Sequence, residues 1–520
     1  GATVTTSTGA ITVDANGTTT VSAAVRATGA GGTITFGATG TGPLTLSVAS
    51  PTAVAQTDGG NITFNRPVTL NANTLISTGA GIGNITFATT APISGTHELT
   101  LTAGTGNVEL ASTAGNPAAL TSLTVSSAAL ARFRDDITTN DADGIEINAT
   151  TINLDELTMT AGTDPGADID LNGNVTLTGG PANLYAIDDI TVSGTVSGGQ
   201  NLTVGPPTPA TPDISFNGDV GTPTPLGAIT ISNGYDITFG GTVAATSITQ
   251  TNGANSTTFA GDVTTTGAIT ITAANDLTFS GTVDALSLAQ DAGSGTTTFE
   301  DDVSTTGAAG INILATNIAL DGPTMEATGA DIVLEGTVTL SGGAVDIEAG
   351  NTITVTGTVN SPDTQALTAT STNDANIVFN DPIGETDALA SLTIDGGDII
   401  LNGIGDNLGS GVTGTITVTA AGFVVLNAAD YRSDGEQTWE APGGVRYLAT
   451  LDGTWSAGVG NTITCTGTNT DVYLDHNGQT LTLTSDLSCR NLYFYRGTLD
   501  CSGIDITTTA NLVLFGTNYN

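Results

Sequence analysis

Two stretches of the chain, GAITISNGYDITFGGTV (residues 227–243) and GAITITAANDLTFSGTV (residues 267–283), decide the fold class. They are copies of one pattern, 40 residues apart. Apolar and polar residues alternate within the pattern, which is typical of short β-strands with one buried face. Gly, Asn and Asp separate the alternating runs and mark turns. The chain is therefore expected to consist of repeated strand and turn units.

A shorter repeat lies inside the longer one: an apolar residue, any residue, Gly or Asp, any residue, then Val or Ile. Most copies follow one another at about 20 to 24 residues, a period that predicts one coil of a parallel β-solenoid per copy. A single coil cannot bury its own apolar face, whereas stacked coils can. The aromatic residues of the clearest copies should stack in the interior at about 4.8 Å per coil. They are Phe216, Phe239, Phe259, Phe279 and Phe299.

The predicted fold is thus all-β, a parallel β-solenoid or β-helix of about 20–24 residues per coil. At roughly 21 residues per coil the chain would make about 25 coils, a rod on the order of 120 Å long. The glycine of the short repeat should provide the tight corner. A string of small β-sandwiches is the competing interpretation, but sandwiches do not repeat their sequence every 20 residues.

The composition divides the chain into a repeat region, 1–429, and a C-terminal section, 430–520, that serves as a solenoid cap or docking end. The C-terminal section is richer in large aromatic residues, among them Trp439 and Trp455, and holds all three cysteines. Cys465, Cys489 and Cys501 are consistent with one disulfide and a remaining thiol, or with three small buried apolar residues.

Charge excludes several classes of partner. The 520 residues include 50 acidic and 8 basic side chains, all eight of them Arg, which gives a net charge of −42. A chain of this charge offers no basic groove to nucleic acid and no basic patch to anionic lipid. No apolar run approaches the ~18 residues that span a bilayer. Charges spread along such a rod lie closer than the ~8 Å screening length, so rods should repel side by side unless divalent cations intervene.

Catalysis is not expected. Adjacent acidic pairs such as Asp135-Asp136, Asp188-Asp189 and Asp301-Asp302 point to opposite faces of a strand, so one pair cannot flank a glycosidic bond. The repeat region is also nearly free of Arg, Tyr and Trp, which clefts that process polysaccharides use. An enzyme acting on polysaccharides is therefore the third-ranked hypothesis.

No cofactor is predicted, and calcium is the one ion that the sequence leaves open. Asp168 and Asp170 begin a stretch that matches the first half of a calcium loop, but Gly179 stands where the loop needs Glu. Asp141, Asp143 and Glu146 form a similarly weak candidate.

The stretches LTLTAGTGNVEL (residues 99–110) and GAITITA (residues 267–273) resemble the filamentous-haemagglutinin-type β-helices of secreted bacterial adhesins. The resemblance implies an extracellular, elongated protein displayed at the cell surface. It transfers no functional residue, because the shared pattern is that of the solenoid itself.

The leading functional hypothesis is an extracellular structural protein, the subunit of a cell-surface filament or a rigid stalk, whose partner is itself through end-to-end contacts. Open solenoid ends expose unpaired strand edges that can template the next subunit. The alternative is an adhesin that binds glycans or a host surface through the Pro-rich loops near residues 206–225 or through the C-terminal section.

Overall fold

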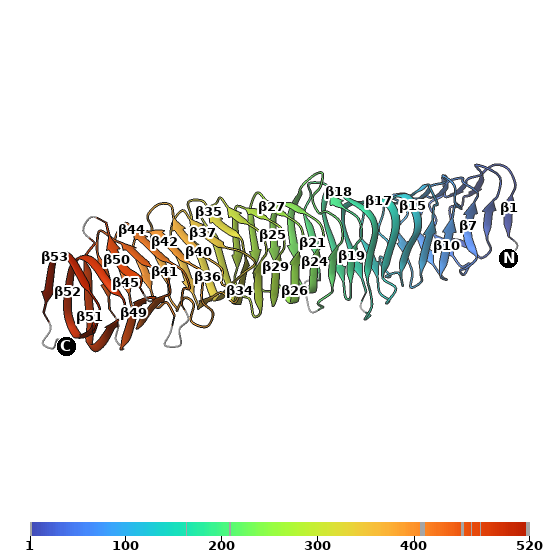
Figure 1. Cartoon of the computed structure of the whole chain (residues 1–520). Coiled ribbons are helices and arrows are strands. Elements are labelled where there is room, and N and C mark those ends of the chain that lie inside the picture. The colour runs from blue at the N-terminus through green and yellow to red at the C-terminus, as the bar shows by residue number, and fades with distance from the viewer. Residues whose placement is uncertain are drawn as a thin grey trace. The chain divides into compact units, whose positions relative to one another are not determined.

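The computed structural model describes residues 3–162, 164–206, 210–405, 411–448, 452–458, 460–467 and 470–515, without the side chains of 476–478. The described residues form parallel strands stacked as a β-solenoid of about 22 turns, with no helix among them (Figure 1). This confirms the predicted fold class. The chain divides into two compact units, residues 1–264 and 265–520. The composition boundary predicted at residue 430 lies inside the second unit and stays a prediction.

The strands of the first unit are β1 (Val4–Thr6), β2 (Ile11–Val13), β3 (Thr19–Val21), β4 (Val25–Ala27), β5 (Ile34–Phe36), β6 (Leu44–Leu46), β7 (Ala53–Thr57), β8 (Ile62–Phe64), β9 (Val68–Leu70), β10 (Thr74–Ser77), β11 (Ile85–Phe87), β12 (Ile93–Ser94), β13 (Leu99–Thr102), β14 (Asn107–Leu110), β15 (Leu123–Phe133), β16 (Ile137–Thr139), β17 (Ile145–Ala161), β18 (Ile169–Ala186), β19 (Ile190–Val192), β20 (Val196–Ser197), β21 (Leu202–Val204), β22 (Ile214–Phe216), β23 (Leu226–Ile231), β24 (Gly234–Phe239), β25 (Val243–Gln250) and β26 (Gly253–Phe259). The division falls within β27 (Val263–Thr265).

The strands of the second unit are β28 (Ala268–Ile271), β29 (Asp276–Phe279), β30 (Val283–Ala285), β31 (Ser287–Gln290), β32 (Thr296–Phe299), β33 (Val303–Thr305), β34 (Ile311–Asp321), β35 (Thr324–Ala327), β36 (Ile332–Ser341), β37 (Val345–Ala349), β38 (Ile353–Thr356), β39 (Val359–Asn360), β40 (Leu367–Ser371), β41 (Ile377–Phe379), β42 (Leu392–Gly396), β43 (Ile399–Leu401), β44 (Ile416–Ala420), β45 (Val424–Leu426), β46 (Asp430–Ser433), β47 (Gln437–Glu440), β48 (Val445–Tyr447), β49 (Gly453–Ala457), β50 (Thr462–Thr466), β51 (Val472–Leu483), β52 (Asp486–Asp500) and β53 (Ile506–Leu514).

Each coil contributes strands to three ladders, and each strand pairs in parallel with its counterpart one coil on. Ile62 of β8, for example, pairs with Ile34 of β5 and with Ile85 of β11. The second of these steps is 23 residues long, within the predicted range, but the first is 28. Several coils carry such insertions, which is why the chain makes about 22 turns rather than the expected 25.

The core follows from strict alternation within each strand. In β24, Ile237 and Phe239 point inward and are fully buried, while Thr238 points outward. The rings of Phe216, Phe239 and Phe259 stack in the first unit at 5.0 and 4.9 Å, with nearly parallel planes. In the second unit Phe279 and Phe299 stack at 5.6 Å. A further stack joins Phe36, Phe64 and Phe87 at 4.8 and 4.3 Å.

Buried polar pairs explain why the sequence repeats at 40 residues as well as at 20. In the first unit the Gln250 side chain hydrogen-bonds the Thr257 hydroxyl at 2.9 Å, and their partners one coil before are Ile231 and Ile237. The second unit repeats the arrangement 40 residues on: the Thr297 hydroxyl donates to Gln290 at 2.6 Å. Alternate coils thus place a polar pair and an apolar pair at the same interior position.

The corner glycines are required by the neighbouring coil, not by an unusual backbone angle. A Cβ on Gly241 would lie 2.8 Å from the carbonyl carbon of Gly218, and one on Gly261 would lie 2.8 Å from that of Gly241. None of the three has a positive φ. The glycine of the short repeat therefore allows adjacent corners to touch.

We expect Gly241→Ala to destabilise the first unit by about 1 to 3 kcal/mol, because the added methyl group meets backbone atoms that cannot turn away. Gly343→Ala is the matched control, since its nearest atom beyond the chain neighbours is 3.6 Å from the new Cβ. Urea unfolding of both variants measures the effect. Equal stability of the two would show that the corners have room to separate.

Candidate functional site

The acidic side chains connect successive coils. A carboxylate oxygen of Asp219 accepts the backbone N–H of Thr242 at 2.9 Å, and Asp331 accepts that of Thr352 at the same distance. Each bond joins a turn to the equivalent turn one coil on. Asp14, Asp136, Asp168, Asp213, Asp236, Asp276, Asp302, Asp398, Asp430, Asp452 and Asp486 accept backbone N–H groups in the same way. Much of the acidity of the chain therefore has a structural role at the turns.

Two of the acidic pairs considered for catalysis take part in these connections. Asp136 accepts the N–H of Thr158 and Asp302 accepts that of Thr324, both at 2.8 Å. Asp135 and Asp301 each accept the N–H of the acidic residue that follows. These carboxylates are bound to backbone donors rather than gathered around a cleft.

Of the calcium candidates, the structure brings together Glu146, Asp168 and Asp170. Glu146 and Asp170 are register partners on β17 and β18, and Asp168 lies two residues before Asp170. Burial raises the pKa of Asp168 and that of Asp170, and neighbouring carboxylates raise both further. Asp141 and Asp143 lie in the turn before β17, where Asp141 accepts the N–H of Ala142. In the described part of the chain, no three His, Cys, Asp or Glu side chains are arranged to hold a metal ion.

The first unit should respond to pH in two opposite ways. Because the pKa of Asp170 is raised in the folded state, this group costs stability at neutral pH, and the cost disappears as pH falls through its folded pKa. The pKa of Asp236 is lowered, chiefly by the Ser256 hydroxyl, so its contribution is present above pH 3.8 and is lost below. Asp170→Asn should therefore stabilise the unit at pH 7, and Asp236→Asn should destabilise it, each by up to about 1 kcal/mol after solvent screening.

Urea unfolding of these two variants at pH 7 and pH 5 measures the difference. The gain from Asp170→Asn should shrink at the lower pH. A gain independent of pH would mean that repulsion between carboxylates is not its cause.

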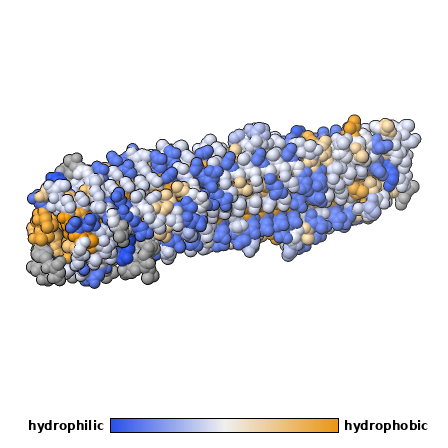
Figure 2. Space-filling model, in the orientation of Figure 1, coloured by the Kyte–Doolittle hydropathy of each residue, from blue (hydrophilic) through white to orange (hydrophobic). Residues whose placement is uncertain are grey.

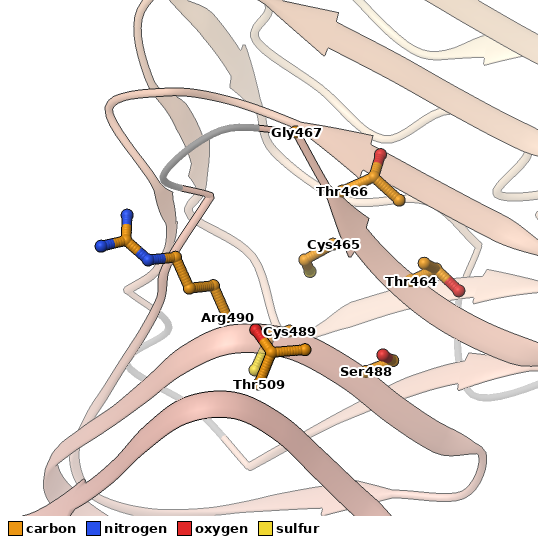
Figure 3. Close-up of a pocket in the computed structure, with 8 residues that line it drawn as sticks. All are labelled: Thr464, Cys465, Thr466, Gly467, Ser488, Cys489, Arg490 and Thr509. Carbon is orange, nitrogen blue, oxygen red and sulfur yellow. The ribbon is translucent and has the colours of Figure 1, made fainter.

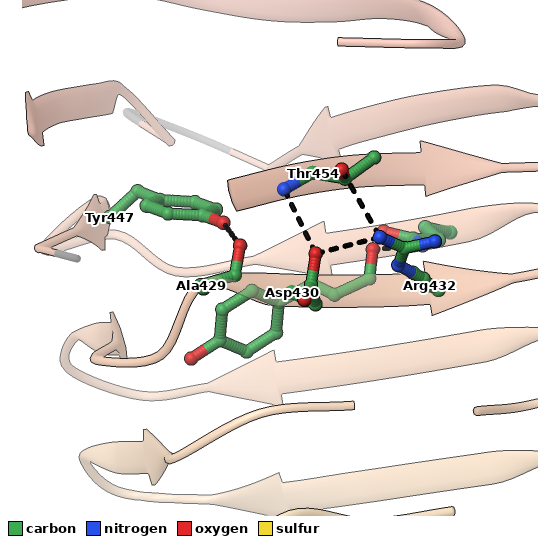
Figure 4. Close-up of polar contacts among 7 residues, drawn as sticks. Ala429, Asp430, Arg432, Tyr447 and Thr454 are labelled. Atoms are coloured by element: carbon green, nitrogen blue, oxygen red, sulfur yellow. Dashed lines mark hydrogen bonds and ion pairs between the residues drawn. The ribbon is translucent and has the colours of Figure 1, made fainter. Parts of the chain in front are cut away.

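The C-terminal coils have a thicker, partly polar core. Trp439, Trp455, Tyr431 and Tyr447 are all fully buried. The Tyr447 hydroxyl donates to the carbonyl of Ala429 (Figure 4). Figure 4 also shows Asp430 accepting from the Arg432 guanidinium at 2.9 Å and from the backbone N–H of Thr454 at 3.1 Å. These groups bind one another and form no open cleft.

The three cysteines are free thiols in this structure, so the predicted disulfide stays a prediction. Cys465 and Cys489 are buried, and Cys501 is half-buried. Burial raises the pKa of Cys489 to about 11 and that of Cys465 well above its ordinary value, so both stay protonated at neutral pH. The two line a cavity of about 510 Å³ together with Arg490 and Thr509 (Figure 3). Protonated thiols are poor nucleophiles and poor metal ligands.

The last described coil exposes residues that would be core residues elsewhere. Leu512 and Leu514 of β53 are register partners of Leu492 and Phe494, which are fully buried, yet they are 53% and 43% exposed. Phe515 is 60% exposed. Figure 2 shows apolar side chains gathered at this end of the second unit. We call Leu512, Leu514 and Phe515 the C-terminal end face.

The first coil shows the same feature. Val4 of β1 is 53% exposed, whereas its register partner Val25 is buried. Among the described residues β1 pairs with β4 alone, and β53 pairs with β52 alone. Both strands therefore present a free edge of backbone N–H and C=O groups.

No protein family matches the chain, and no curated protein or solved structure is significantly similar to it. The fold and side-chain chemistry define the class of this protein as a parallel β-solenoid. None of the described segments is a helix that is long and apolar enough to cross a membrane.

Proposed function

We propose that this protein is an extracellular structural protein, the subunit of a cell-surface filament or stalk whose solenoids join end to end. The observation that supports it best is the C-terminal end face, where inward-facing apolar residues lack a covering coil. A further coil placed on β53 would bury them and satisfy its free edge.

A second copy of the chain suits this position because its β1 offers the other free edge and an apolar inward residue, Val4. The ends are also poor in charge: residues 3–25 contain one acidic side chain, Asp14, and residues 501–515 contain one, Asp505. End-to-end contact therefore avoids most of the repulsion expected from a net charge of −42. The extracellular location is proposed from the resemblance to secreted adhesin repeats.

Sedimentation velocity over a range of concentrations tests the proposal. The wild-type chain should form species whose mass increases with concentration, and Leu514→Asp should suppress them by placing a charge in the junction. Leu286→Asp is the matched control, because Leu286 is similarly exposed, at 45%, but lies away from the ends. Growth that is equally sensitive to both substitutions, or no growth at all, would contradict the proposal.

A further inference from the structure

One ladder of the second unit carries apolar residues on its outer face as well as its inner face. We call it ladder A, and it includes strands β36, β38, β41, β43, β45, β48 and β51 to β53. Several of its strands read as unbroken apolar triplets, as in Ile377–Phe379, Ile399–Leu401 and Val424–Leu426. The middle residue of each points outward, so it does not contribute to the core.

These outward residues stand in one register column, each paired with the next. The column consists of Val333, Thr354, Val378, Ile400, Val425, Arg446, Tyr473, Tyr493 and Val513. All nine are half-buried, and none is acidic. We call this column the outer stripe.

The solenoid itself does not require the outer stripe. The same coils carry another ladder whose outward column is an unbroken run of threonines: Thr368, Thr393, Thr417, Thr438 and Thr464. Threonine satisfies the strand conformation and faces water without cost. A continuous apolar column on a soluble surface instead indicates a contact site.

Polar side chains border the stripe. On one side the amide of Asn402 donates to the carbonyl of Asn380 at 3.0 Å, and on the other Asn376 accepts the N–H of Asp398 at 3.2 Å. Nine positions at about 4.8 Å each give a length of roughly 40 Å, and the width with its borders is about 15 Å. The area of roughly 600 Å² per copy lies at the low end of specific protein interfaces.

We propose that the outer stripe is a self-association surface on which a second copy of this chain packs side by side. Net charge selects this partner: two acidic copies repel unless they meet where carboxylates are absent, and the only ion in the column is the Arg446 guanidinium, which lies 3.8 Å above the Phe423 ring. Two identical stripes in antiparallel orientation match each other in length and in spacing. Such pairing is independent of the end-to-end contact.

The geometry of the rings argues against a sugar chain on the stripe. The rings of Tyr473 and Tyr493 stack at 5.0 Å with planes 8° apart, so their mutual contact covers the faces that would hold a sugar. They present their edges outward. The aliphatic part of the stripe offers no ring at all.

The test is sedimentation velocity over a range of concentrations in a Leu514→Asp background, which removes end-to-end growth. The parent should show a monomer–dimer equilibrium, and the triple variant Val378→Thr, Ile400→Thr, Val425→Thr should weaken it at least tenfold. The matched control replaces the threonines of the other ladder, Thr393→Ser, Thr417→Ser and Thr438→Ser, and should leave the equilibrium unchanged. A parent that stays monomeric at every concentration overturns the proposal, whether or not it binds polysaccharide.

Cross-linking provides a second readout that tolerates partial loss of stability. In a Cys501→Ser background, Ile400→Cys should give a covalent dimer with a short bismaleimide, and Thr417→Cys should not. Equal cross-linking at both positions would mean that contact is not confined to the stripe. Loss of end-to-end growth in the wild-type chain with retention of this dimer would count against the proposed function alone.

Discussion

Replacing Gln437 with Leu is expected to destabilise the C-terminal part of the second unit by about 3 to 5 kcal/mol. Gln437 is fully buried, and its amide oxygen accepts the indole N–H of Trp439 at 3.3 Å and that of Trp455 at 2.7 Å. Its amide nitrogen donates to the carbonyl of Ser456 at 2.6 Å. Leucine has a similar volume but leaves both indole donors buried without an acceptor, which costs more than the bonds themselves stabilise.

Tryptophan fluorescence during urea unfolding measures this effect directly, because Trp439 and Trp455 are the two tryptophans of the chain. The control is Gln290→Leu combined with Thr297→Val. The amide nitrogen of Gln290 is buried without a partner, so removing this polar pair should be nearly neutral or stabilising. If both variants lost equal stability, loss of packing rather than of hydrogen bonds would be the cause.

Replacing Phe239 with Ala should cost the first unit about 3 to 5 kcal/mol, since the ring is fully buried between those of Phe216 and Phe259. Coils interact with their neighbours alone, so the loss should be felt mainly by β22, β24 and β26. Hydrogen exchange followed by mass spectrometry should show faster exchange in these strands.

Tyr235→Ala is the matched control for this prediction, because Tyr235 lies in the same strand but is 47% exposed. It should leave exchange almost unchanged. Uniformly faster exchange throughout the first unit after Phe239→Ala would contradict the nearest-neighbour description of the solenoid.

The interior of the solenoid was accessible from the sequence because it depends on periods of two and of about twenty residues. Alternation in β24 and the spacing of Phe216, Phe239 and Phe259 both appear directly in the residue pattern. The bonds that connect coils were less accessible. That Asp219 holds the N–H of Thr242 depends on which turns come into register, and loops of variable length set that register.

Two other features were missed for distinct physical reasons. Arg66 is buried and reaches two coils back to the Thr19 hydroxyl at 2.5 Å, a contact that no local pattern encodes. The outer stripe was visible in the sequence as apolar triplets such as Ile399–Leu401. Those triplets looked like ordinary core strands, and only the register places their middle residues in one outward column.

Electron cryomicroscopy of the purified, concentrated chain tests end-to-end assembly most directly. The account predicts unbranched filaments in which the axial strand spacing of about 4.8 Å continues across the junctions between subunits. It also predicts that Leu514→Asp prevents their formation while Leu286→Asp does not. Isolated particles of single-subunit length at every concentration, or filaments whose junctions exclude β53, would contradict it.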